Sequence, residues 1–240
     1  MKFLTILLLS IPMLYQAQTK GVIKDVSANE FKVLIEQEKG ILLDVRTPGE
    51  VSTGTIPNAS VIDFYDAEFL KKINLMDKSK EIYVYCKGGG RSSQAATILA
   101  DNGFKTIYNL SGGIMAWENM NYPITKPTQA TDEHIQEMSV EDFHKLISTQ
   151  QPVLVDFHTI WCAPCKKMAP IIDDLEKAYA GKAIVLRIDV DKSKALAKQY
   201  QVQGVPVFML FQEGKVLWKD NGMQSKETLE EQLNKAIEKH

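Results

Sequence analysis

Short apolar runs alternate with amphipathic segments along most of the chain, and this alternation restricts the fold more than any other feature. Residues 41–45 (ILLDV) and 81–86 (EIYVYC) are such runs, and residues 91–103 (RSSQAATILADNG) carry apolar residues at helical spacing before a glycine. A run that is apolar on both faces belongs inside a sheet that is covered on both sides. The sequence therefore predicts an α/β fold with parallel strands.

The alternation stops once and then starts again, which divides the chain into two domains. The stretch NYPITKPTQATDEH has two prolines and no hydrophobic period. We place the first domain at 20–126, a linker at 127–132 and the second domain at 133–240, and 240 residues suit two domains of ordinary size. In the second domain VPVFMLF and KVLWKD, joined by the turn QEG, predict an antiparallel hairpin, so its sheet is mixed.

Composition and charge exclude one class of partner. Hydrophobic residues make up 45% of the chain and charged residues 24%, which is typical of a soluble globular protein. The net charge is −2 and no run of basic residues occurs. We therefore expect no nucleic-acid partner.

The N-terminal segment resembles a secretory signal peptide. Lys2 precedes an apolar run at 3–15 that is too short to span a bilayer comfortably, and Ala17 offers a small residue at a cleavage point. We expect a cleaved signal peptide at 1–17 and export to the periplasm. An uncleaved N-terminal anchor is the alternative.

The stretch YVYCKGGGRSS places Cys86 between a strand and a helix, in company that favours an anionic sulfur. Glycines let successive backbone N–H groups turn toward one point, and the helix N-terminus adds partial positive charge. These surroundings should lower the pKa of the thiol and make it a nucleophile. A cysteine that is merely buried after a glycine-rich turn is the alternative. The residues expected to form this cradle are Lys87, Gly88, Gly89, Gly90, Arg91 and Ser92.

The first domain resembles the rhodanese family. The segments LLDVRTPGEVSTGTIPNA, CKGGGRS and GGIMAWENMNYPI are similar to that family's motifs, although Thr55 stands where the family usually has histidine. The resemblance implies sulfur transfer, in which Cys86 becomes a persulfide and passes its sulfur to an acceptor. The loop from Cys86 to Arg91 has six residues, as in rhodanese-like sulfurtransferases, whereas the related phosphatases have a loop one residue longer. We interpret Asp44 and Arg46 as a structural ion pair.

The stretch DFHTIWCAPCKKMAP places two cysteines at the start of a second predicted helix. Cys162 at the helix N-terminus is stabilised as a thiolate, and Cys165 lies three residues on, on the same face. An attacking sulfur and a nearby resolving sulfur make a thiol–disulfide exchanger. A structural disulfide is one alternative, and a metal site with His158 as third ligand is another. Because Trp161 and Pro164 favour redox chemistry, we predict no metal.

The second domain resembles thioredoxin, through VDFHTIWCAPCKKMAP and GVPVFMLFQEGK. The resemblance implies a Cys162–Cys165 disulfide, a cis bond between Val205 and Pro206, and a buried acid, Asp156, that helps to deprotonate the resolving cysteine. Three departures from the family should shift the reduction potential and the surface. Arg187 stands in place of lysine, His158 in place of tryptophan, and Ala163 in place of glycine. The site residues implied in this domain are Asp156, Trp161, Cys162, Cys165, Val205 and Pro206.

Together the two motifs predict an enzyme that links sulfur transfer to disulfide exchange. Cys86 would accept sulfane sulfur from an anionic donor such as thiosulfate, and the Cys162/Cys165 dithiol would reduce the persulfide. Further expected partners are protein disulfides or a membrane thiol protein that supplies electrons, and no cofactor is expected. One alternative is an envelope disulfide reductase or isomerase whose first domain is only a binding module. Another is a copper or sulfur carrier.

Overall fold

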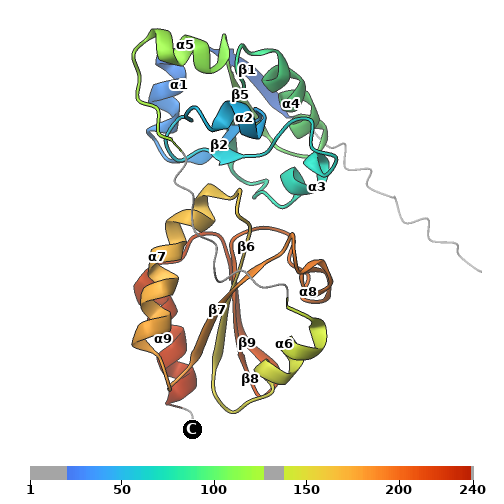
Figure 1. Cartoon of the computed structure of the whole chain (residues 1–240), viewed down its shortest axis with the longest axis vertical. Helices are drawn as coiled ribbons and strands as arrows, with labels where there is room; N and C mark the ends of the chain where they lie inside the picture. The colour runs from blue at the N-terminus through green and yellow to red at the C-terminus, as the bar shows by residue number, and fades with distance from the viewer. Residues whose placement is uncertain (1–20, 127–137, 239–240) are drawn as a thin grey trace, which may run out of the picture.

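The computed structural model describes residues 21–126 and 138–238 and folds them into two α/β domains stacked end to end (Figure 1). The expected signal peptide at 1–17 and the expected linker at 127–132 lie outside the described residues. Within the described ranges every helix is too short or too polar to cross a lipid bilayer.

The first domain is built on a five-stranded sheet in the order β1-β5-β4-β2-β3, with every pair parallel. Its strands are β1 (Val22–Val26), β2 (Gly40–Asp44), β3 (Ser60–Val61), β4 (Glu81–Tyr85) and β5 (Thr106–Leu110). β4 lies at the centre and is buried after its first residue, as its apolar sequence predicts. β3 lies at an edge, so one side of its backbone is free of sheet partners.

Helices cover both faces of the first sheet, because β2 and β4 present apolar side chains to both sides. The helices are α1 (Ala28–Ile35), α2 (Pro48–Val51), α3 (Phe69–Asn74), α4 (Gly90–Asp101) and α5 (Gly113–Asn119). Phe31 of α1 and Trp117 of α5 pack on one face against Tyr83 and Tyr85. On the other face, α3 and α4 pack against the opposite side chains of β4.

The second domain has a four-stranded sheet in the order β7-β6-β8-β9. Its strands are β6 (Val153–His158), β7 (Ile184–Asp189), β8 (Val207–Gln212) and β9 (Lys215–Asn221), and its helices are α6 (Val140–Ile147), α7 (Ala163–Ala178), α8 (Lys194–Gln199) and α9 (Lys226–Ile237). β6 and β7 are parallel, whereas the β6–β8 and β8–β9 pairs are antiparallel. α7 and α9 cover one face, and α6 and α8 the other. The predicted fold, a parallel-sheet domain followed by a mixed-sheet domain, is confirmed.

The structure differs from the sequence prediction in the short elements of the first domain. β3 has only the two residues Ser60 and Val61. β1, α2 and α3 were not anticipated, because four of the five β1 residues are exposed and each of the two helices is too short to show a helical period. These elements matter, because β3 and the end of α3 prove to lie at the boundary with the second domain.

The predicted ion pair between Asp44 and Arg46 is present and buried. The two charged groups approach to 2.6 Å, and the Arg46 guanidinium also donates to the Gly54 carbonyl oxygen at 2.6 Å. A buried charge of this kind is tolerated because it is paired and hydrogen-bonded. The pair joins the end of β2 to the loop that follows α2, beside the Cys86 loop.

Candidate active site

Cys86 follows β4 directly, and the loop after it wraps around its sulfur. The Gly89 N–H donates to the Cys86 Sγ at 3.1 Å, and the Ser92 hydroxyl donates to it at 3.4 Å. The side chain is almost fully buried. These donors favour the anionic form of the sulfur.

The electrostatics of the loop lower the pKa of Cys86. Burial alone would raise this pKa, but the Ser92 hydroxyl and the backbone N–H groups of Ser92, Gly89 and Gly88 together outweigh it. The net direction is that of an activated thiol rather than an inert buried one. This agrees with what the glycine-rich loop predicts.

The shape of the loop depends on glycine at two positions. Gly89, just before α4, has φ of 101°, a conformation that other residues rarely adopt. Gly113 begins α5 with φ of 60°, and a Cβ there would overlap the carbonyl oxygens of Cys86 and Lys87. This close approach lets the N-terminus of α5 hold the loop, because the Ile114 N–H donates to the Cys86 oxygen at 2.8 Å. No local sequence pattern indicates this role of Gly113, because it depends on the approach of α5 to a distant loop.

Arg91 does not supply the free positive charge that the sequence suggested. Its guanidinium forms a two-fold ion pair with Glu50, with both N–O distances 2.7 Å. The hydrogen bond from Arg91 lowers the pKa of Glu50 to about 2, so the carboxylate is charged at neutral pH. Much of the arginine charge is thus offset, and Lys87 points an exposed side chain to solvent. The donors to the Cys86 sulfur are backbone N–H groups and the Ser92 hydroxyl, and the site roles of Lys87 and Arg91 stay predictions.

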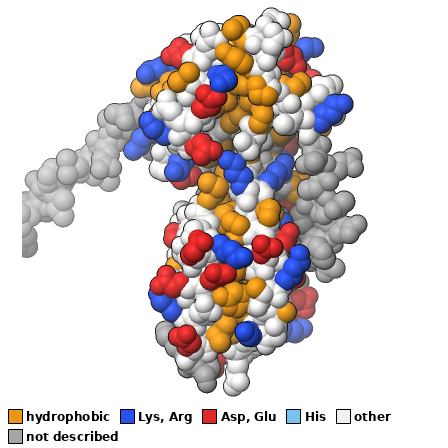
Figure 2. All heavy atoms as spheres, turned by 90° about the vertical axis from the view of Figure 1, so that its left-hand side faces the viewer, with side chains coloured by type: hydrophobic (Ala, Val, Ile, Leu, Met, Phe, Trp, Pro, Cys, Tyr) orange, Lys and Arg blue, Asp and Glu red, His pale blue; other side chains and the backbone are white. Residues whose placement is uncertain are grey.

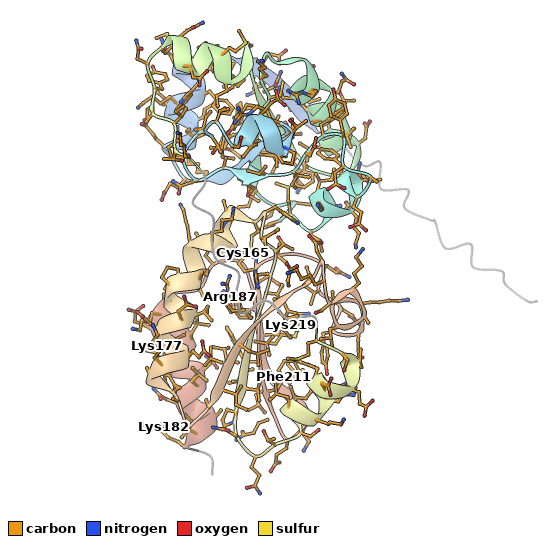
Figure 3. All side chains as sticks on the ribbon, in the orientation of Figure 1. Cys165, Lys177, Lys182, Arg187, Phe211 and Lys219 are labelled. Carbon is orange, nitrogen blue, oxygen red and sulfur yellow. A yellow bond between two sulfur atoms is a disulfide. The ribbon has the colours of Figure 1, made fainter. Side chains whose placement is uncertain are left out.

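Cys162 and Cys165 form a disulfide at the start of α7, at the end of the second domain that faces the first (Figure 3). Their Cα atoms are 5.3 Å apart, as adjacent turns of a helix allow. Cys162 is the N-cap residue, and its Sγ accepts a hydrogen bond from the Cys165 N–H at 3.1 Å. Both sulfurs therefore lie where the helix N-terminus stabilises negative charge.

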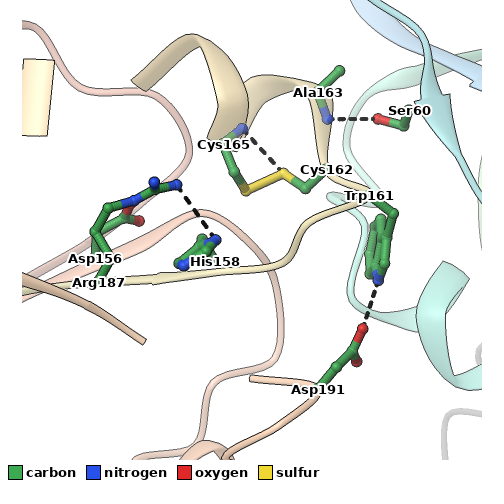
Figure 4. The surroundings of a disulfide bond; sticks show 9 residues. All are labelled: Ser60, Asp156, His158, Trp161, Cys162, Ala163, Cys165, Arg187 and Asp191. Atoms are coloured by element: carbon green, nitrogen blue, oxygen red, sulfur yellow. Dashed lines mark hydrogen bonds and ion pairs between the residues drawn. A yellow bond between two sulfur atoms is a disulfide. The ribbon is translucent and has the colours of Figure 1, made fainter. Parts of the chain in front are cut away.

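Two buried polar side chains, Asp156 and His158, lie beneath α7 beside the partly exposed Arg187 (Figure 4). Asp156 and His158 share a face of β6 with Leu154, which packs against α7. The Arg187 Nε lies 3.2 Å from Asp156, and its Nη2 lies 3.4 Å from the His158 Nδ1. One Asp156 oxygen and the His158 Nε2 have no hydrogen-bond partner among the described residues.

Burial sets the protonation of this group. Desolvation raises the pKa of Asp156 to about 7 despite the nearby Arg187. Desolvation, and then the charge of Arg187, lower the pKa of His158 to about 3, so the imidazole is neutral at physiological pH. A carboxyl group poised near neutrality can exchange a proton with its surroundings during a reaction.

Comparison with known proteins decides the family. A model described as Thioredoxin matches residues 134–235, and one described as Rhodanese-like domain matches residues 27–120. A thioredoxin of Staphylococcus aureus is 43% identical over 84 residues, which are 35% of this chain and 81% of that protein. The chain is a rhodanese–thioredoxin fusion. Its two domains indicate a redox role and a sulfurtransferase-type role.

Two solved structures are also similar to the fusion. A mutant thioredoxin from Halobacterium salinarum is 32% identical, with a TM-score of 0.40, over 46% of the fusion and 96% of that chain. A rhodanese-related protein from Thermoplasma volcanium is 28% identical, with a TM-score of 0.39, over 43% of the fusion and 99% of that chain.

The remaining predicted site residues of the thioredoxin domain surround the disulfide. The Val205–Pro206 bond is cis, as predicted, and Pro206 is buried. The Trp161 indole N–H donates to Asp191 at 2.8 Å, which fixes the ring (Figure 4). The backbones of Trp161 and Val205, expected to contact substrate, instead contact the rhodanese domain of the fusion.

The two sulfur centres are not joined in this arrangement of the fusion. Within the described residues, Cys86 is the free cysteine, and its sulfur is bonded to groups of its own loop. A cavity of about 430 Å³ lies at the domain boundary beside Ala163 and Pro164, and none of its lining residues is a cysteine. In residues 21–126 and 138–238, no three His, Cys, Asp or Glu side chains gather closely enough to hold a metal ion.

Proposed function

We propose that the fusion takes sulfane sulfur onto Cys86 and uses the Cys162/Cys165 dithiol to remove it by reduction. The observation that carries this proposal is the donor set on the Cys86 sulfur, because hydrogen bonds from Gly89 and Ser92 favour an anion there. The same donors suit the terminal sulfur of a persulfide. Two cradles for sulfur anions in one chain support a linked reaction.

The first half of the reaction loads sulfur onto the rhodanese domain. The Cys86 thiolate attacks the outer sulfur of thiosulfate, a new S–S bond forms, and sulfite leaves with the electron pair of the broken bond. The product is a persulfide on Cys86. The thiolate is a competent nucleophile because its pKa is lowered by the loop.

The second half consumes the dithiol. The Cys162 thiolate attacks the inner sulfur of the persulfide, so hydrosulfide leaves and a Cys86–Cys162 disulfide forms. Cys165, deprotonated with the help of Asp156, then attacks the Cys162 sulfur and releases the Cys86 thiolate. The dithiol gives up two electrons and becomes the disulfide, and a thiol partner that supplies electrons must reduce it again.

Mass spectrometry of the reduced fusion after exposure to thiosulfate tests this reaction. We expect one added sulfur on Cys86, followed by release of sulfide and formation of the Cys162–Cys165 disulfide. In Cys165→Ser the reaction should stop at a disulfide between Cys86 and Cys162, because the resolving sulfur is missing. Absence of sulfur on Cys86 in the unmodified chain would defeat the choice of donor.

A second function is favoured by the way the domains meet. The hydrogen bonds that the described residues of the rhodanese domain make with the dithiol face come from β3 and the end of α3. This supports a disulfide reductase or isomerase whose rhodanese domain only binds the other domain or a partner. Cys86→Ser would then leave reduction of protein disulfides unchanged, whereas Cys162→Ser would abolish it.

The expected cellular place of the fusion is part of the same proposal. Residues 1–17 have the composition of a signal peptide. Export would place the fusion in the periplasm, where sulfur donors and protein disulfides meet. N-terminal sequencing of the mature protein tests this, and an intact Met1 would count against cleavage.

A further inference from the structure

The dithiol face of the thioredoxin domain is covered by the rhodanese domain. Cys162 is 2% exposed, Cys165 is 0% exposed and Trp161 is 6% exposed. These three residues belong to the same apolar cluster as Ile62 and other core residues of the rhodanese domain. A reactive disulfide is thus buried by another part of its own chain.

Backbone hydrogen bonds join the two domains on both sides of the disulfide. Before α7, the Val61 N–H donates to the Trp161 oxygen at 3.2 Å, and the Ala163 N–H donates to the Ser60 hydroxyl at 3.0 Å (Figure 4). Before β8, the Val205 N–H donates to the Leu75 oxygen at 3.0 Å. The disulfide therefore lies between two loops that both offer backbone groups.

Backbone groups of this kind recognise an extended polypeptide without regard to its side chains. β3 is an edge strand of the rhodanese sheet, and the N–H of its Val61 is free to bond outward. Val61 thus meets the thioredoxin domain through its backbone, as an extended segment of a protein disulfide substrate would, and Ser60 adds its side-chain hydroxyl. Leu75 supplies a carbonyl oxygen on the other side.

We propose that the rhodanese domain is an intramolecular cover of the dithiol face, which competes with protein disulfides because it occupies this face in the closed chain. Protein disulfides reach Cys162 only after the two domains separate. Transfer of sulfur from Cys86 needs the same separation, because the rhodanese domain presents β3 and the end of α3 to the dithiol. This inference rests on the proposed disulfide exchange.

The ionic contacts at the boundary agree with a closed state that can open. Lys194 pairs with Glu68 at 2.8 Å and Lys167 with Glu38 at 3.6 Å. All four side chains are largely exposed, so each pair adds little to the closed state. The covered area is held by a few backbone bonds and one apolar cluster, which suits reversible docking.

Alkylation of the reduced full-length fusion tests the proposal without requiring enzyme activity. The probes are iodoacetamide and a maleimide carried on a polyethylene glycol chain, and peptide mass spectrometry assigns the reaction to Cys162. Ser60→Ala leaves the Ala163 N–H without a partner in the closed state, so we expect bulky alkylation to accelerate on the order of tenfold. The matched control is Ser52→Ala, whose hydroxyl bonds only within its own domain.

Charge reversal gives a second measurement, and misfolding cannot explain its result because the double variant should regain the slow rate. Glu68→Lys and Lys194→Glu should each speed bulky alkylation several-fold, and the double variant should restore the slow rate. The proposal would be overturned if Ser60→Ala and both charge reversals left the rate of bulky alkylation of Cys162 unchanged.

Reduction of insulin by the same variants separates this inference from the proposed function. Acceleration of both alkylation and insulin reduction supports the two together. Faster alkylation with no insulin reduction in any variant would support the covered face and reject disulfide exchange.

Discussion

The ion pair between Arg91 and Glu50 reduces the positive charge that Arg91 contributes at the Cys86 loop. An arginine beside a nucleophilic cysteine suggests a large positive potential, but here a carboxylate bonds both of its terminal nitrogens. The Cys86 sulfur is stabilised mainly by neutral donors at short range. The pair also fixes α2 against α4, so Glu50 positions the loop as well as tuning its charge.

Glu50→Gln should lower the pKa of Cys86 by about half a unit to one unit, because the Arg91 charge is no longer offset. The disulfide form of the chain is suited to the measurement, since Cys86 is then its free thiol. Thiolate absorbance against pH gives the value. Glu36→Gln, which removes an exposed carboxylate of α1, is the control, and an unchanged or raised pKa in Glu50→Gln would contradict the argument.

The buried carboxyl of Asp156 gives the stability of the second domain a pH dependence. Its pKa is about 7 in the folded chain against 3.8 ordinarily. At pH values between 3.8 and about 7, Asp156 is protonated in the folded state and ionised in the unfolded state. The free energy of unfolding therefore falls as pH rises through this range. Asp156→Asn should therefore raise the free energy of unfolding at pH 7 by on the order of a few kcal/mol.

The lowered pKa of His158 changes stability with pH in the opposite direction, so the contributions of His158 and Asp156 can be distinguished. Its pKa is about 3 folded against 6.5 ordinarily, so the unfolded state binds the extra proton and stability falls as pH drops below 6.5. In Asp156→Asn this acid limb should remain, whereas the loss of stability with rising pH should become smaller. Urea unfolding of the oxidised chain from pH 4 to about pH 8 measures both, and curves parallel to those of the unmodified chain would refute the assignment.

At the scale of elements, the Cys86 loop depends on how closely α5 approaches it. Gly113→Ala would place a methyl group against the carbonyl oxygens of Cys86 and Lys87 at a positive φ. We expect a loss of about 1–3 kcal/mol in unfolding free energy and slower sulfur loading of Cys86. Urea unfolding and persulfide formation measure the two effects.

Gly88→Ala is the matched control for this change. It lies in the same loop, and a Cβ there meets no atom within 4 Å. Its N–H remains available to the sulfur. Equal effects of the two substitutions would show that the approach of α5 is not what limits the loop.

The long elements followed from the sequence and the short ones did not. β4, α4, β6 and α7 have apolar patterns that specify strand or helix by themselves. β1 at one sheet edge has charged residues within its apolar sequence, β3 at the other edge has only two residues, and α2 and α3 are too short to show a period. Their existence depends on neighbours distant in sequence, as in the pairing of Leu43 with Ser60.

At the scale of the whole molecule, the domains are held together by apolar and backbone contacts rather than by charge. The ion pairs Lys167–Glu38 and Lys194–Glu68, which cross the boundary between described residues, are exposed, and such pairs contribute at most about 1 kcal/mol each. Side chains of both signs are intermixed over the face shown in Figure 2. No strong net attraction between the domains is needed to explain their contact.

High salt should therefore leave the closed state intact. At about 1 M salt the screening length is about 3 Å, which removes most of the surface attraction. Small-angle X-ray scattering at low and high salt should give the same radius of gyration. Expansion at high salt would mean that the ion pairs, and not the Trp161 cluster and the backbone bonds, hold the domains together.

The sequence by itself determined the two folds, the three cysteines and the chemistry to which each is suited. Those features depend on patterns local to each segment: apolar runs, a glycine-rich loop and two cysteines at a helix start. Only the tertiary structure decided that Glu50 offsets Arg91, that Gly113 holds the Cys86 loop, and that β3 covers the dithiol. Each of these joins residues far apart in the chain, and no local pattern encodes which distant backbone groups will meet.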